Sequence, residues 1–261
     1  MRTLRMEKLV LVVPVFNEAS RWNSQYWSNL TALSDIFWIF VNDGSTDQTS
    51  KLLTNLDLNQ NGVVLSLEKN LGKAEAIRNG LEYFFDTLDS QNTLVGYLDA
   101  DGAFTLEEIL RFQKLAQKLT TSEVARNQQE FDWVWSSRVG LRGRHIQRKK
   151  SRHYIGRIIA TYLGSTFPNL PYDSQSGFKI FKPSGALKTA VSKPFHTHWF
   201  IDLELLIRTS QIACREIEVW EEPLNSWRDV PGSALSWKNF LQIMIEIRYV
   251  KKMIKGNFSH K

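Results

Sequence analysis

The chain has 261 residues, of which 43% are hydrophobic and 12% aromatic. This composition excludes a disordered or fibrous protein, and the length suffices for one α/β domain with a substantial core plus a short appendage. The formal net charge of +6 leaves nucleic acid, anionic lipid and phosphorylated substrates open as partners, so the position of the cations matters more than their sum.

Cysteine content and apolar runs bear on the compartment and on membrane insertion. A single cysteine, Cys214, cannot form an internal disulfide and suits a reducing compartment, so we expect a cytoplasmic protein. A short apolar run at 9–16 follows the basic N-terminus, and Asn17 stands where a signal peptide would be cleaved, so we expect a core strand there. No run reaches the roughly 18 apolar residues that span a bilayer. We therefore expect no membrane crossing and leave open a peripheral contact with the cytoplasmic face.

Short apolar runs recur along the chain and predict strands. They are nearly continuous and rich in β-branched and aromatic residues, which is typical of strands buried on both faces. The runs lie at 9–16, 36–41, 63–67, 93–98, 131–136, 178–181 and 216–220. Helical patterns lie between or after them at 45–56, 73–88, 105–119 and 236–255. This order predicts an α/β fold with an open, mostly parallel sheet flanked by helices and a C-terminal helical tail.

Local signals mark two helix starts and one loop. Ser45 or Thr46 can cap the helix after the second strand, and Thr105 with Glu108 forms a capping box after the fourth. The polar and basic residues 140–153 predict a mobile loop.

Polar residues follow each of the first four predicted strands. They occupy 14–18, 42–47 and 70–73 after the first three strands, and Asp99 and Asp101 follow the fourth. Ligands of open α/β sheets bind beyond the carboxyl ends of the strands, so we expect these residues to meet. Asp99 and Asp101 can face one hard cation, Mg²⁺ or Mn²⁺, that keeps positions open for substrate phosphates. Turn residues without a function would explain any one of these ends, but less readily all four.

In combination and order, five motifs resemble those of the family 2 inverting glycosyltransferases, which have the GT-A fold. They are VPVFNE at 13–18, VNDGSTD at 41–47, NLGKA at 70–74, LDAD at 98–101 and DSQSGFK at 173–179. The last resembles the signature of the dolichyl-phosphate glucosyl- and mannosyltransferase branch, and the likeness extends from residue 8 to residue 233. It implies a metal-dependent transfer of a hexose from a UDP- or GDP-linked sugar to a polyprenyl-phosphate or other lipid-linked acceptor.

For the donor, the resemblance implies a pocket at the carboxyl edge of the sheet. Pro14, Asn17 and Glu18 would frame the nucleoside, and Asp43 would hydrogen-bond its base or ribose. Lys73 would offset negative charge on the donor.

The resemblance also implies roles for four acidic residues around the transferred sugar. Asp99 would contact the ribose or the metal and Asp101 the metal itself, where Mg²⁺ or Mn²⁺ stabilises the departing nucleoside diphosphate. Asp202 and Glu204 would line the sugar pocket.

Asp173 has two candidate catalytic roles, which depend on the acceptor. A sugar hydroxyl must lose a proton when it attacks the anomeric carbon, and Asp173 would be its base. A lipid monophosphate, whose second pKa is about 6, is largely a dianion at neutral pH and barely needs a base. Asp173 would then orient groups or balance charge.

Cations that suit a phosphate acceptor gather after the fifth predicted strand. Arginine forks match phosphate oxygens, and the segment 138–152 is dense in arginine. The residues implied for acceptor binding are Arg138, Arg142, Arg144, Arg148, Gln175 and Arg228. A solvated loop or an RNA-binding patch would explain the same charge, but aromatic residues are sparse there and no RNA-binding motif accompanies it, so we expect no nucleic acid.

We divide the chain into a GT-A domain at 1–233 and a basic amphipathic helix at 234–261. The apolar stripe of this helix can pack on the domain or lie in a bilayer interface, and both remain open. The alternatives to a lipid-linked acceptor are transfer to a sugar hydroxyl in surface polysaccharide synthesis and a non-catalytic nucleotide-sugar-binding module. The retained Asp99, Asp101 and Asp173 count against the binding module. The sequence leaves the oligomeric state open.

Overall fold

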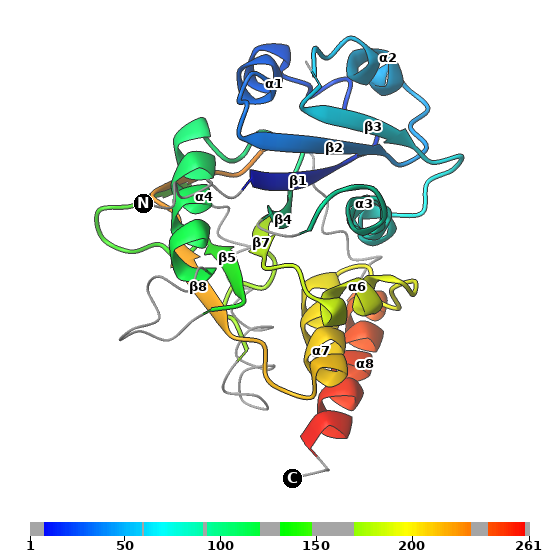
Figure 1. Ribbon diagram of the computed structural model, residues 1–261, viewed down its shortest axis with the longest axis vertical. Coiled ribbons are helices and arrows are strands. Elements are labelled where there is room, and N and C mark those ends of the chain that lie inside the picture. The colour runs from blue at the N-terminus through cyan, green and yellow to red at the C-terminus, as the bar shows by residue number, and fades with distance from the viewer. Residues whose placement is uncertain are drawn as a thin grey trace.

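The computed structural model describes residues 8–58, 60–90, 93–120, 131–147, 170–230 and 240–258. The strands of its main sheet are β1 (Lys8–Val15), β2 (Ile36–Asn42), β3 (Gly62–Ser66), β4 (Thr93–Leu98), β5 (Trp133–Ser137), β7 (Phe178–Phe181) and β8 (Val219–Pro223). They are arranged in the order β3-β2-β1-β4-β7-β5-β8 (Figure 1). Neighbouring strands are parallel except at β7, which is antiparallel to both β4 and β5. The open, mostly parallel sheet predicted from the sequence is confirmed.

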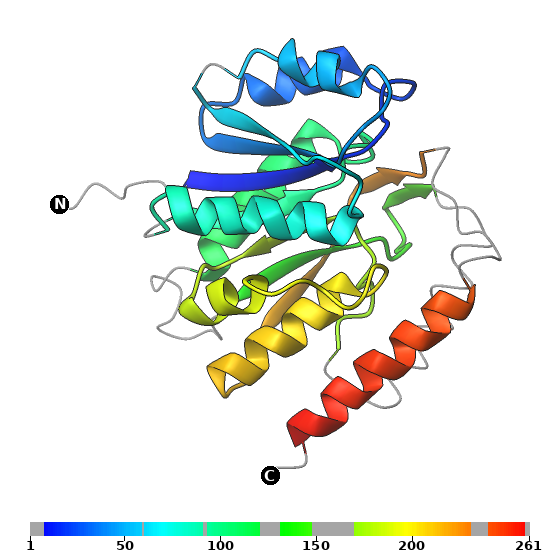
Figure 2. The same ribbon diagram turned by 90° about the vertical axis from the view of Figure 1, so that its right-hand side faces the viewer.

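Helices cover both faces of this sheet (Figures 1 and 2). One face carries α1 (Ser24–Thr31), α2 (Thr49–Thr54) and α4 (Leu106–Thr120), and the other carries α3 (Lys73–Thr87), α6 (Gly185–Val191), α7 (Ile201–Ala213) and α8 (Phe240–Phe258). Side chains of β1 alternate between the two layers: Leu9 and Leu11 pack in the first, Val10 and Val12 in the second. The strands are therefore buried on both faces, as their continuous apolar character predicts.

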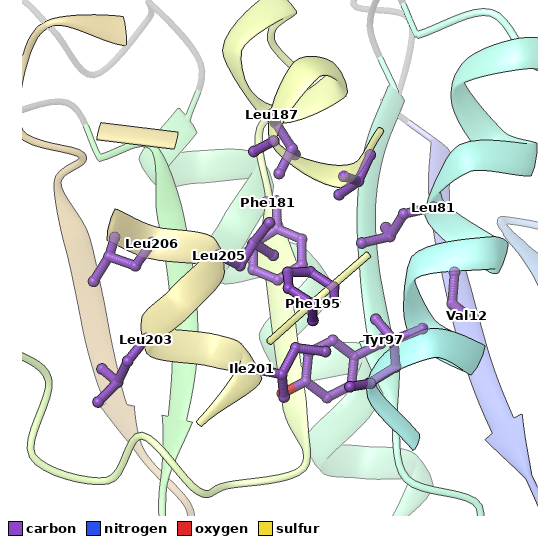
Figure 3. Packing of buried hydrophobic residues seen from close by; sticks show 14 of the residues in the cluster. Val12, Leu81, Tyr97, Phe181, Leu187, Phe195, Ile201, Leu203, Leu205 and Leu206 are labelled. Atoms are coloured by element: carbon purple, nitrogen blue, oxygen red, sulfur yellow. The ribbon is translucent and has the colours of Figure 1, made fainter. Parts of the chain in front are cut away.

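The second layer joins α7 to the centre of the sheet (Figure 3). Ile201 and Leu205 of α7 point toward Tyr97 of β4 and Phe181 of β7. Removing these side chains from water supplies most of the favourable free energy of the contact. Apolar packing thus fixes α7 against the strands that carry the polar site.

The predicted C-terminal helix is present as α8 and packs on the domain. Its apolar stripe is buried in the same layer as α7 and consists of Ile243, Ile247, Val250 and Ile254. Leu241 and Ile245, on the opposite side, stay exposed. No helix in the described ranges is long and apolar enough to cross a membrane. The expected domain boundary at residue 233 falls within 231–239, outside the described residues, and stays a prediction.

The predicted loop 140–153 contains a short strand. This strand, β6 (His145–Gln147), pairs in parallel with β9 (Ser226–Arg228) and forms a ribbon beside the main sheet. The prediction of a loop was wrong here because the pairing partner lies far away in the sequence and leaves no local signal.

Two predicted helix caps had different outcomes. The helix after β2 begins only at Thr49, without a side-chain cap, and Ser45 instead accepts the N–H of Asn17 at 3.1 Å. Thr105 does cap α4, because its hydroxyl accepts the N–H of Glu108 at 3.3 Å. Ser45 thus makes a tertiary contact in place of the first predicted cap, whereas the second predicted cap, Thr105, is present.

Gly80 sets the distance between α3 and the sheet. A Cβ at this position would lie 2.3 Å from Cγ1 of Val12, which is fully buried. Gly80→Ala should lower the free energy of unfolding by about 1–3 kcal/mol, because overpacking outweighs the better helix propensity of alanine. Gly185→Ala in α6 is the matched control: nothing lies within 4 Å of its Cβ, so stability should be unchanged or higher. Urea unfolding compares the two variants, and equal stabilities would contradict the close approach.

Candidate active site

The loops that follow the first four strands carry residues with positive φ. These are Asn17, Gly44, Gly72 and Gly102, with φ of 49°, 63°, 94° and 72°. At Gly44 contact also excludes a side chain, because a Cβ would lie 2.4 Å from the carbonyl carbon of Lys69. Pro14, predicted to frame the nucleoside, lies beside Val41 where β1 and β2 approach the same edge. The predicted convergence of these strand ends is therefore present.

Asp43 and Asn17 hold the loops of this edge together. The Asp43 carboxylate is 2% exposed and accepts the N–H groups of Leu71 and Gly72, each at 2.8 Å. The side-chain oxygen of Asn17 accepts the N–H of Thr46 at 2.9 Å. Each contact joins two loops that lie about thirty residues apart in the sequence. The contact of Asp43 with a base or ribose stays a prediction.

Lys73 begins α3 and forms an ion pair with Asp99, with Nζ 2.6 Å from Oδ1. The ammonium also lies over the ring of Tyr97, 5.7 Å from its centroid. Burial lowers the pKa of Lys73, but nearby carboxylates, chiefly Asp99, outweigh this and leave the pKa raised. The Lys73 side chain is 46% exposed, so a charged ammonium is available to a bound anion.

Asp99 and Asp101 follow β4, as predicted, and influence each other electrostatically. Burial and the charge of Asp99 raise the pKa of Asp101 to about 6, although the N–H of Ala103 donates to Asp101 at 3.0 Å. Oδ1 of Asp99 is buried and, within the described residues, has no donor beyond the Lys73 ammonium. Two crowded carboxylates with a single cationic partner fit a divalent cation, which would favour the ionised form of both.

Glu18 brings a third carboxylate to this group. Its pKa is raised by burial, against the opposing effect of its ion pair with Arg21, and the Asp99 charge raises it further. Among the described residues, no three His, Cys, Asp or Glu side chains are arranged to hold a metal ion. A cation at Asp99 and Asp101 would therefore complete its shell with water and substrate oxygens, as Mg²⁺ does at diphosphates.

Asp173 and Arg138 form a buried ion pair. Arg138 directly follows β5, and Asp173 lies in the segment 172–177 that precedes β7. The Asp173 carboxylate is 7% exposed and accepts three N–H groups of Arg138: the backbone at 2.8 Å, Nε at 2.8 Å and Nη2 at 2.6 Å. Burial lowers the pKa of Arg138, but the charge of Asp173 reverses this and leaves it raised. The ring of Trp227 covers the guanidinium at 5.4 Å. The candidate base and the first acceptor arginine are thus each other's partner.

Lys179 holds the segment 172–177 through contacts with its backbone. The sequence analysis did not single out this lysine. It is fully buried in β7, and its ammonium donates to the carbonyl oxygens of Ser174 at 3.0 Å and Ser176 at 2.5 Å. It also pairs with Asp202 at 3.2 Å, and burial lowers its pKa against that charge. A lysine inside an apolar strand was the available signal, because an ammonium is buried only where it has partners.

Gly177 brings the same segment into contact with the turn that carries Asp99 and Asp101. Its carbonyl accepts the N–H of Asp99 at 2.9 Å, and a Cβ on it would lie 2.1 Å from Oδ2 of Asp99. Gln175, expected at the acceptor, donates its side-chain amide to the carbonyl of Trp199 at 2.7 Å. The donor and acceptor halves of the predicted site are therefore in direct contact.

Asp202 and Glu204 are both buried in the first turn of α7. Asp202 contacts the hydroxyl of Tyr97 and the ammonium of Lys179. Glu204 accepts backbone N–H groups of 196–197 at 2.8–3.1 Å and so holds the loop before α7. Their role in a sugar pocket stays a prediction.

The other arginines predicted to bind the acceptor lie on or beside the ribbon of β6 and β9. Arg142 and Arg144 precede β6, and Arg228 lies in β9 opposite Gln147. Arg142 and Arg228 are exposed, whereas Arg144 is half-buried. The prediction for Arg148 lies outside the described residues. The structure thus brings three predicted cations to one ribbon, whose Trp227 contacts the Arg138 guanidinium.

The sheet, its helical layers and the acidic carboxyl edge are those of an α/β transferase with a GT-A fold. A family model described as glycosyl transferase family 2 matches residues 10–170. The chain belongs to glycosyl transferase family 2 and is a glycosyltransferase.

Curated relatives support the branch expected from the motifs. The chain is 27% identical over 247 residues to a dolichyl-phosphate beta-glucosyltransferase of Trichomonas vaginalis, with 90% of this chain and 68% of the relative covered. It is 28% identical over 273 residues to the dolichyl-phosphate beta-glucosyltransferase of Homo sapiens, with 94% and 76% covered. The resemblance to this branch is confirmed.

Solved structures support the fold. Glucosyl-3-phosphoglycerate synthase from Mycobacterium tuberculosis in complex with Mg²⁺ and UDP matches with a TM-score of 0.58 and 18% identity, over 96% of this chain and 79% of that chain. The same synthase with Mn²⁺, UDP-glucose and phosphoglyceric acid gives a TM-score of 0.57 at 18% identity, with the same coverage. Likeness at this identity establishes the fold alone.

The raised pKa of Asp101 predicts that cation binding weakens in acid. Below about pH 6 the carboxyl is protonated in the cation-free protein, and a cation must displace that proton. Affinity for Mn²⁺, titrated by EPR without nucleotide, should fall about tenfold from pH 7 to pH 5. Asp101→Asn should bind Mn²⁺ more weakly at pH 7 and with a flatter pH dependence. An equally steep decline in the variant would assign the titration to another group.

Proposed function

We propose that this protein is a metal-dependent inverting glucosyltransferase that uses UDP-glucose and transfers the sugar to a polyprenyl phosphate. The names of the curated relatives support the sugar and the acceptor class, and the UDP-glucose of the structural neighbour supports the donor. The observation that carries the proposal is the contact of Asp99, which pairs with Lys73 and lies beside Asp101, with Gly177 of the segment that contains Asp173.

The donor side is charged to receive a diphosphate. A divalent cation held by Asp99 and Asp101 would act as a Lewis acid on the departing UDP. Lys73 lies next to Asp99 and is exposed enough to reach the same phosphates. Its ion pair holds the ammonium in place before the donor binds, and charge positioned in advance lowers the barrier to charge separation.

The acceptor side favours a phosphate over a hydroxyl. Three N–H groups of Arg138 already occupy the two oxygens of Asp173, which leaves this carboxylate poorly placed to take a proton. A phosphate monoester needs no such base, because its second pKa is about 6. Asp173 would instead orient Arg138 toward the acceptor charge, and the arginines of the β6–β9 ribbon would supply further cations.

A polyprenyl chain remains in the bilayer, so we propose peripheral attachment at the cytoplasmic face. The outward face of α8 supports this: Leu241 and Ile245 are exposed and are followed on the same face by exposed Arg248 and Lys252. An apolar patch beside cations suits an anionic lipid interface.

The deciding assay offers labelled UDP-glucose, UDP-galactose and GDP-mannose to the purified protein with dolichyl phosphate or undecaprenyl phosphate in detergent. Label should enter the organic phase only with UDP-glucose, and EDTA should abolish the transfer. Asp101→Ala should reduce transfer about 10²-fold or more, because the charge on the leaving UDP loses its stabilisation. Label that enters only a soluble glycan, or transfer undiminished by EDTA, would overturn the proposal.

The role of Asp173 separates the two acceptor classes. If the acceptor is a phosphate, Asp173→Asn should lower kcat about tenfold, through misplacement of Arg138, whereas loss of a general base costs about 10²–10⁴-fold. Asp132→Asn is the matched control, because Asp132 forms a similar two-pronged pair with Arg215 at the opposite end of β5, with both N–O distances 2.6 Å. It should leave kcat unchanged. A loss beyond 10²-fold in Asp173→Asn, with an acid limb removed from the pH profile, would point to a hydroxyl acceptor.

A further inference from the structure

A buried carboxylate of α8, Glu246, reaches toward the acceptor side of the site. Glu246 is 2% exposed and lies beside Ile243 and Ile247 on the face that packs on the domain. Its Oε2 accepts the backbone N–H of Trp199 at 2.8 Å, and its Oε1 accepts the side-chain amide of Gln242 at 3.0 Å. An ionised carboxylate is costly to bury, and an apolar residue would suit this face better, so stability alone does not account for Glu246.

Trp199 joins this carboxylate to the acceptor segment. Its N–H donates to Glu246, and its carbonyl oxygen accepts the amide of Gln175 at 2.7 Å. Gln175 belongs to the segment 172–177 and lies two residues after Asp173. Trp199 therefore connects Glu246 of α8 to the segment 172–177, which contains Asp173.

The same contact sets the start of α7. Phe200 is the N-terminal flanking residue of α7 and provides no side-chain cap. The position of Trp199 therefore depends on partners from elsewhere in the chain, and Glu246 supplies one of them. Asp202, in the first turn of α7, contacts Lys179 beneath the segment 172–177, so a shift of Trp199 would reach this segment by two routes.

We propose that Glu246 is a positioning residue for the acceptor side of the active site, acting through Trp199 on Gln175. On this reading α8 is part of the catalytic domain and not an appendage to it. The inference rests on the proposed transfer to a polyprenyl phosphate for its kinetic readout. It also has a structural readout that does not need any transfer.

The test compares three variants of the full chain. Glu246→Leu removes both hydrogen bonds at similar volume. Glu246→Gln keeps an oxygen for the Trp199 N–H. Ile247→Ala weakens α8 packing and keeps both hydrogen bonds of Glu246. Glu246→Leu should raise the acceptor KM about tenfold while the Kd of UDP with Mn²⁺ stays within about twofold. Glu246→Gln should restore the KM of the wild type. Ile247→Ala should lower Tm and leave the KM unchanged.

Amide hydrogen exchange provides the readout that is independent of activity. Peptides that cover 172–177 should exchange faster in Glu246→Leu than in the wild type, and Ile247→Ala should leave their exchange unchanged. If Glu246→Leu does not fold, Glu246→Asp replaces it in the test. The aspartate side chain is one methylene shorter, which draws the carboxylate away from the Trp199 N–H. The same changes in KM and exchange should then appear, but smaller.

Two results would overturn the role of Glu246. One is unchanged acceptor KM and unchanged exchange at 172–177 in the Glu246 variants. The other is an Ile247→Ala variant that reproduces both effects, because general loosening of α8 would then explain them. If the wild-type protein does not transfer sugar to polyprenyl phosphate, the proposed function is refuted instead. Hydrogen exchange at 172–177 would then still test whether Glu246 positions this segment through Trp199.

Discussion

The arrangement of the active site depends on one buried charge, the ammonium of Lys179. It lies beneath the segment 172–177 and holds two of its carbonyl oxygens as well as the Asp202 carboxylate. Without this cation, three acceptor groups would be buried with too few donors, at a cost of about 1–3 kcal/mol for each neutral group and more for the charged one. This anchor helps to hold the Asp173–Arg138 pair and the contact of Gly177 with the turn that carries Asp99 and Asp101.

Each half of the predicted site contains an ion pair. On the predicted donor side Lys73 holds Asp99, and on the predicted acceptor side Arg138 holds Asp173. These pairs hold the half-exposed Lys73 ammonium and the buried Arg138 guanidinium in fixed orientations. Charge that is oriented beforehand needs little rearrangement when new charge develops, which is the main electrostatic advantage of an enzyme over water.

The C-terminal helix illustrates how packing and polar contacts combine. The isoleucines of α8 attach it to the core layer of α7, and Glu246 uses that attachment to hold Trp199. The outward face keeps exposed Leu241 and Ile245. One helix can thus serve the interior and the surface at once, because residues three or four apart share a face.

The strands, the α/β class and the donor-side motifs could be predicted because each is local: a continuous apolar run followed by polar turn residues. Asp99, Asp101 and Lys73 were predicted as site residues in this way. The role of Lys179 depends on partners up to 82 residues away, and a single-sequence pattern does not contain them. The β6–β9 ribbon was missed for the same reason.

What the sequence by itself determined was which residue types stand at the strand ends, and hence the chemistry that the edge of the sheet can support. Only the tertiary structure decided the pairings: Asp173 with Arg138, Lys179 with Asp202, and Glu246 with Trp199. Local sequence specifies the period and the ends of an element, whereas pairing depends on how the elements pack. A charged side chain in the interior takes the partner that packing brings to it.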